Sequence, residues 1–77
     1  MEFFKSKGQG QFFKRVGSRV VIVCKYDFNP GIEVTTYDAK LCDALEVTAC
    51  SEQEFDQAFF EVQEFLSSFA AGMALAA

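Results

Sequence analysis

Cysteine and acidic side chains are the groups in this sequence whose chemistry is suited to catalysis or metal binding. The three cysteines are Cys24, Cys42 and Cys50, and Asp43 follows the second of them. Structural zinc sites use close-set pairs of ligands, and this spacing contains no such pair. We therefore expect packed free thiols, with no metal and no cofactor.

Histidine is absent from the sequence. General acid–base catalysis at neutral pH would therefore fall to a carboxylate, thiol or lysine with a shifted pKa. A cysteine or serine nucleophile would lack an imidazole base, and the sequence has neither a phosphate-binding glycine-rich loop nor a nucleophile elbow. These features predict a protein that is not an enzyme.

Charge is divided along the chain. Residues 1–25 carry a net charge of +5, and residues 26–77 carry a net charge of −9. Such a division predicts a surface with two regions of opposite sign, which can steer charged partners. Net charge by itself does not indicate a fold.

The length of 77 residues predicts one domain over 1–77. A domain of about this size buries only roughly 60% of the surface exposed by its unfolded chain, so its core is marginal. Ten phenylalanines and a hydrophobic content of 51% exclude a disordered chain. An odd number of cysteines and the lack of a signal-like N-terminus predict a cytoplasmic protein, and no apolar run is long enough to predict a membrane span.

The elements that would position these groups begin with strands. Strands are expected over 11–16, 19–26 and 32–37, with a tight turn at Gly17 between the first two. Residues 1–10 are interpreted as a flexible arm or an edge strand. Residues 38–50 are compatible with strand or helix, and the alternation over 44–48 favours a fourth strand.

A helix is predicted over 51–71, followed by a frayed tail over 73–77. Ser51 and Glu54 have the spacing of a capping box. Apolar residues then recur every three or four positions on one face: Phe55, Ala58, Phe59, Val62, Phe65, Leu66 and Phe69. The predicted fold is α+β, an antiparallel sheet of three or four strands (a β-meander) with this amphipathic helix packed on one face.

The acidic side of this helix is the first candidate binding site. One interpretation is an ordinary solvated surface; the other is a docking face for a basic groove, in which spaced carboxylates take the place of phosphates. Phe60 lies off the apolar stripe and is a candidate anchor for a partner. The candidate partner-binding residues are Glu52, Glu54, Asp56, Phe60, Glu61 and Glu64.

The basic N-terminal third suggests an alternative, in which lysine and arginine neutralise phosphates while phenylalanine rings stack on unpaired bases. The same basic residues could instead protect a sheet edge or contact the acidic helix of a second copy in a homodimer. The candidate nucleic-acid-binding residues are Lys5, Lys7, Lys14, Arg15 and Arg19.

The chain ends in Ala74, Leu75, Ala76 and Ala77. This ending resembles the last four residues of the tag that bacterial transfer-messenger RNA adds to stalled proteins. The resemblance covers these residues only and implies a degradation signal on a short-lived regulatory protein. The polar upstream part of the tag is missing, and an alanine-rich tail can end this way by chance.

Together these features predict a small, non-catalytic, protein-binding module. The most concrete hypothesis is a stoichiometric inhibitor or regulator of a nucleic-acid-handling protein, such as a phage or mobile-element anti-defence (anti-CRISPR-like) protein. The alternatives are a nucleic-acid-binding module and a structural subunit of an oligomer.

Overall fold

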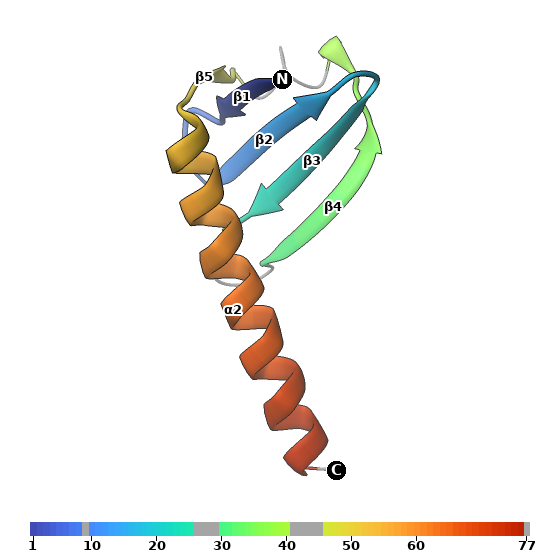
Figure 1. Cartoon of the computed structure of the whole chain (residues 1–77), viewed down its shortest axis with the longest axis vertical. Coiled ribbons are helices and arrows are strands. Elements are labelled where there is room, and N and C mark those ends of the chain that lie inside the picture. Colours follow the sequence, from blue (N-terminus) through green and yellow to red (C-terminus); the bar gives the residue numbers. More distant parts are fainter. Residues whose placement is uncertain (9, 26–29, 41–45, 77) are drawn as a thin grey trace.

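A computed structural model describes the backbone of residues 1–8, 10–25, 30–40 and 46–76, and the side-chain surroundings of these residues up to 69. It has an antiparallel sheet of five strands in the order β4-β3-β2-β1-β5, followed by one long helix, α2 (Figure 1). The α+β class is as predicted. The elements are β1 Glu2–Lys5, β2 Gln11–Val16, β3 Arg19–Cys24, β4 Gly31–Thr36, β5 Thr48–Ala49 and α2 Glu52–Ala76.

The sheet has five strands, whereas three or four were predicted. The N-terminal segment is strand β1, and it lies inside the sheet between β2 and β5. Phe4 is opposite Phe13 of β2 on one side and opposite Ala49 of β5 on the other. Pairing on both sides satisfies backbone groups that a free arm would leave to water. Of the fourth strand expected over 44–48, only Thr48 lies in a strand, β5; residues 46 and 47 are not strand, and residues 44 and 45 lie outside the described part of the chain.

Strands β2 and β3 form the predicted hairpin. Gly17 has a φ of 63°, the left-handed conformation that a tight turn between twisted strands requires. The register places Phe12 opposite Val23, and Val16 opposite Arg19 beside the turn. Because side chains alternate between the faces of a strand, Phe12 and Val23 lie on the face that α2 covers.

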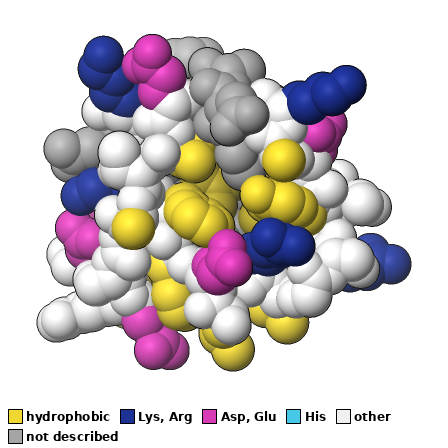
Figure 2. All heavy atoms as spheres, turned by 90° about the horizontal axis from the view of Figure 1, so that it is seen from above, with side chains coloured by type: hydrophobic (Ala, Val, Ile, Leu, Met, Phe, Trp, Pro, Cys, Tyr) yellow, Lys and Arg dark blue, Asp and Glu magenta, His cyan; other side chains and the backbone are white. Residues whose placement is uncertain are grey.

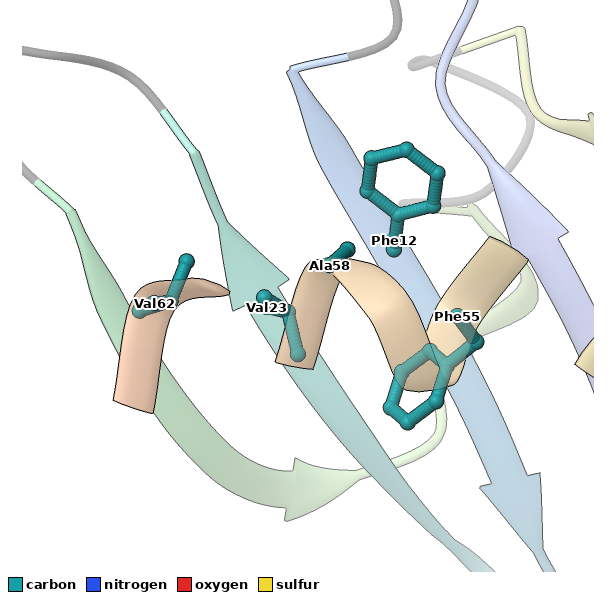
Figure 3. Packing of buried hydrophobic residues seen from close by; sticks show 5 residues of the cluster. All are labelled: Phe12, Val23, Phe55, Ala58 and Val62. Atoms are coloured by element: carbon teal, nitrogen blue, oxygen red, sulfur yellow. The ribbon is translucent and has the colours of Figure 1, made fainter. Parts of the chain in front are cut away.

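Helix α2 begins with the predicted capping box. The backbone N–H of Glu54 donates to Oγ of Ser51 at 3.1 Å, and the backbone N–H of Ser51 donates to Oε2 of Glu54 at 2.8 Å. The buried cluster beneath the helix joins side chains of α2 to side chains of β2 and β3 (Figure 3). Its members are Phe12, Val23, Phe55, Ala58 and Val62.

The opposite face of the sheet is also partly covered. Phe13 and Val20 point away from α2, and each is buried. Strands β4 and β5 lie at opposite edges of the sheet. Asp38, two residues after β4, lines a hollow on this second face together with Phe13 and Ile22. The central strand pair β2–β3 is therefore packed on both sides.

Helix α2 is much longer than the sheet is wide. It continues past residue 71, where it was predicted to end, as far as Ala76, and its C-terminal half projects beyond the start of β4 (Figure 1). Within the described residues, neither α2 nor any other helix combines the length and the apolar character needed to cross a membrane.

Candidate protein-binding face of helix α2

One flank of α2 is tied to the sheet by two ion pairs. Nζ of Lys5 lies 3.1 Å from Oε1 of Glu54, and Nζ of Lys25 lies 2.7 Å from Oε2 of Glu61. The two glutamates are seven residues apart, two helical turns, and so share one side of the helix. Both are therefore engaged within the molecule.

The same contacts lower the pKa of both glutamates. The hydrogen bond from the Ser51 backbone N–H, followed by the one from Lys5, lowers the pKa of the Glu54 carboxyl group. The hydrogen bond and charge of Lys25 lower the pKa of the Glu61 carboxyl group, and Gln57 adds a smaller contribution. Each hydrogen bond favours the ionised carboxylate.

A small hollow of about 180 Å³ lies between these two ion pairs. Phe12 and Ala58 form its apolar base, and Nζ of Lys25 lies 5.7 Å from the centre of the Phe12 ring. The two lysines that line it, Lys5 and Lys25, are each already paired with a glutamate of α2. The ion pairs therefore join the helix to the sheet, and the hollow between them offers little unbalanced charge to a ligand.

The outward side of α2 carries a different set of residues. Asp56, Phe60 and Glu64 follow one another at four-residue steps, so they form a continuous stripe. Phe60 is 60% exposed although it lies in the part of α2 that packs on the sheet. Among ion pairs between described residues, none involves Asp56 or Glu64. We call Asp56, Phe60 and Glu64 the outward stripe.

The candidate partner-binding residues are thus divided between two sides of one helix. An α-helix turns about 100° per residue, which places Phe60 on nearly the opposite side from Ala58 and Val62. Glu54 and Glu61 lie beside the sheet, and Glu52 is exposed one turn before Asp56. The structure brings together Asp56, Phe60 and Glu64, and separates them from the two paired glutamates.

The basic candidates do not form one surface. Lys14 and Arg15 are neighbours in β2 and so point to opposite faces of the sheet. Three of the five basic candidates contact carboxylates within the molecule: Lys5 contacts Glu54, Lys7 contacts Glu46 at 3.4 Å, and Arg15 contacts Glu2 at 3.9 Å.

The guanidinium of Arg15 also lies 3.9 Å from the centre of the Tyr37 ring. Arg15 therefore contacts a carboxylate and an aromatic ring within its own chain. The alternating strand pattern could have revealed the separation of Lys14 from Arg15.

Lys25 is a site residue that the sequence analysis did not single out. It follows Val23 by two residues, and the alternation of β3 therefore predicts that it points toward the helix face. That pattern, combined with the spacing of Glu54 and Glu61, was the available signal for the ion pair.

The surroundings of the described thiols are those of packed side chains. Cys24 and Cys50 are free and half-buried. Burial, and then the charge of Glu54, raise the pKa of the Cys50 thiol, which leaves it less reactive at neutral pH. Among the residues that the structure describes, no group of three metal-ligating side chains was found. Cys42 and Asp43 lie outside the described residues.

A wider hollow of about 650 Å³ lies on the face of the sheet opposite α2. Phe13, Ile22 and Cys24 line it together with Glu33 and Asp38. Its lining combines apolar strand side chains with carboxylates from β4 and the segment after it. Among the described residues that line it, the charged side chains are both acidic.

The C-terminal residues with the tag-like ending are part of α2. Ala74, Leu75 and Ala76 are helical, and Ala77 lies outside the described residues. The interpretation of this ending as a degradation signal remains a prediction.

Comparison with known protein families found no match for this chain. Comparison with curated proteins and comparison with solved structures also found no match.

Proposed function

We propose that this protein is a non-catalytic protein-binding module that acts through the outward stripe of α2. The observation that carries the proposal is the exposure of Phe60 between two carboxylates on the packed part of the helix. A large aromatic side chain held on a rigid element loses little entropy on binding and can fill a partner's pocket. Asp56 and Glu64 would then face basic groups around that pocket.

The proposed partner surface is basic with an apolar centre. Asp56 and Glu64 are separated by eight residues, about 12 Å along a helix. Glu52 extends the acidic row toward the start of α2, where negative charge also favours the helix dipole. A groove that holds phosphates in a nucleic-acid-handling protein has the required charge. We therefore propose a stoichiometric inhibitor or regulator of such a protein, with an anti-defence protein of a phage or mobile element as the specific form.

The nucleic-acid-binding alternative has less support. Lys5, Lys7 and Arg15 contact carboxylates of their own chain, and phosphate binding would have to compete with these contacts. Lys14 and Arg19 remain on the helix-facing side of the sheet, too few to make a long phosphate-binding track.

Affinity capture with matched variants tests the proposal. The wild-type protein, Phe60→Ala and the double variant Asp56→Lys/Glu64→Lys are each used to capture proteins from a bacterial lysate treated with nuclease. Glu33→Lys is the control, because Glu33 is an exposed carboxylate on β4, away from α2. We expect a protein that is retained by the wild type and by Glu33→Lys and is lost with both α2 variants.

The captured protein is then assayed for nucleic-acid binding with and without this protein. Inhibition by an equimolar amount supports the inhibitor form of the proposal. Capture that α2 variants leave unchanged contradicts the proposal. Capture that disappears after nuclease treatment favours the basic residues instead.

A further inference from the structure

The sheet-facing side of α2 continues beyond the sheet. Phe65, Leu66 and Phe69 follow Ala58 and Val62 on this side at helical spacing. Phe65 and Phe69 are 50% and 59% exposed, and their rings stack with centroids 6.2 Å apart. We call these three residues the overhang. Its side chains match the chemistry of the buried cluster, yet no described part of the chain covers them.

The sheet has an open area that corresponds to the overhang. Helix α2 packs where Phe12, Val23 and Ile32 lie across the strands. On the same face, nearer the β2–β3 turn, Val16 and Val34 are 50% and 58% exposed. Figure 2 views the molecule from the end opposite the C-terminus and shows hydrophobic side chains near the middle, with charged side chains of both signs around them.

Strand β4 is at the edge of the sheet. Among the described strands it pairs only with β3, so one side of its six-residue backbone has no partner strand. Such an edge readily pairs with another strand. Its start is also where α2 leaves the sheet (Figure 1).

We propose that two copies of this chain dimerise through antiparallel pairing of β4 with β4, and that each overhang covers the open area of the other copy's sheet. Antiparallel pairing reverses the direction of the second sheet. The first copy's helix crosses its own β4 near Ile32, at the beginning of that strand. After the reversal, the second copy's helix crosses near the other end of the first copy's β4. Each helix occupies the area that the other leaves open.

The register follows from helix spacing and charge. Strand residues advance about 3.4 Å each, and opposed side chains must lie on the same face. Pairing Val34 with Val34 places the two helices about 14 Å apart where they cross β4. Pairing Glu33 with Glu33 would place them about 7 Å apart, closer than the 8–10 Å of packed helices, and would oppose two like charges. We infer the register centred on Val34.

Charge complementarity supports a second copy as the occupant. The last turn of α2 has no basic residue, so nothing in that turn offsets the negative end of the helix dipole. In the dimer this end approaches the open area of the other sheet, where Lys14 and Arg19 lie on the same face as Val34. Among ion pairs between described residues, none includes Lys14 or Arg19.

The exposed area is sufficient for a small interface. Each half-exposed phenylalanine of the overhang offers about 100 Å². Leu66, Val16 and Val34 add further apolar area, and each chain contributes both an overhang and an open sheet area. With the β4 edge included, the buried surface comes near the lower limit of specific interfaces, roughly 600 Å² per partner.

The dimer is independent of the proposed function, because the outward stripe lies on the other side of α2. Sedimentation equilibrium tests it on the full chain at concentrations up to the order of 100 μM. We expect a mass of twice the 8.6 kDa of the chain. Val34→Lys and Phe69→Glu should each weaken the dimer by about 30-fold or more.

Phe60→Glu is the matched control, because Phe60 is exposed to the same extent as Phe69 but lies outside the dimer interface. It should leave the dimer intact while abolishing capture of the proposed partner. Circular dichroism verifies that each variant is folded. A monomeric wild type overturns the inference, as does a dimer that survives both Val34→Lys and Phe69→Glu, or one that only Phe60→Glu disrupts.

Cross-linking tests the register separately. In the proposed pairing the two Val34 Cα atoms are about 4.5–5.5 Å apart, within the range of a disulfide. Under mild oxidation Val34→Cys should give a covalent dimer well above the wild-type level, and Glu33→Cys should not. Cross-linking of Glu33→Cys in preference to Val34→Cys overturns the proposed register.

Discussion

Lys25 and Glu61 form the shortest ion pair between described residues, with Nζ of Lys25 2.7 Å from Oε2 of Glu61. The pair connects the end of β3 to the middle of α2, and Lys5 with Glu54 makes the same kind of connection from β1. These contacts fix which flank of the helix faces the sheet. They also leave the outward stripe as the acidic surface available to another molecule.

The first prediction concerns acid stability. The pKa of Glu61 is lowered in the folded state, so its contribution to stability is present above the usual value of 4.5 and is lost as pH falls through the lower folded value. Glu61→Gln should therefore be less stable than the wild type at pH 7, and the difference should shrink below pH 4.5. Thermal unfolding followed by circular dichroism at a series of pH values measures this.

Glu64→Gln is the control, because Glu64 has no ion pair among described residues. Its stability should follow that of the wild type across the pH series. A difference between Glu61→Gln and wild type that stays constant with pH would contradict the assigned role of Lys25.

The second prediction concerns the start of α2. Ser51→Ala removes the hydroxyl that accepts from the Glu54 backbone N–H. We expect a loss of about 1 kcal/mol in the free energy of unfolding, measured by urea denaturation. Ser67→Ala, an exposed position inside the same helix, should have little effect or stabilise slightly. Equal losses at both positions would argue against the capping box.

The third prediction concerns the two faces of the sheet. Phe13 is 2% exposed on the face away from α2, and Phe55 is buried beneath the helix. Replacement of either by alanine should cost about 3–5 kcal/mol, while Phe60→Ala should cost less than about 0.5 kcal/mol. Urea denaturation compares the three variants, and leucine replacements at Phe13 and Phe55 serve if the alanine variants do not fold. A small loss at Phe13 would mean that the second face is not packed.

The fourth prediction concerns the β2–β3 turn. A Cβ atom added at Gly17 would meet no other atom within 4 Å, so only backbone strain opposes a substitution there. Gly17→Ala should destabilise by about 1 kcal/mol, because alanine disfavours a positive φ. Gly17→Asn should cost less, since asparagine adopts this conformation more readily. Equal costs for the two variants would contradict this explanation.

Local patterns were sufficient to predict the central part of the fold. Residues 11–16 and the capping box at Ser51 were located correctly because alternation, turn chemistry and capping are properties of neighbouring residues. Strands β1 and β5 were harder to identify. They pair with each other although Lys5 and Thr48 are far apart in sequence, and β5 has only two residues. Such short, non-local pairing leaves almost no periodic signal.

The candidate site shows the same limit. Helical spacing alone places Glu61 and Phe60 on different sides of α2. Which side of α2 meets the lysines of the sheet depends on the angle at which the helix crosses the strands, and that crossing angle cannot be read from the sequence. The alternation of β3 therefore indicates only that Lys25 faces the helix, and its pairing with Glu61 becomes evident once the elements are packed together.

Because α2 continues without a break to Ala76, the C-terminal end of this helix is rigidly connected to the buried cluster. Phe55, Ala58 and Val62 belong to the same helix, and they supply three of the five side chains in the buried cluster. A force applied to the last residues would unwind α2 turn by turn toward these side chains. An unfolding enzyme that pulls the chain from this end would detach α2 from the sheet before it unfolded any strand.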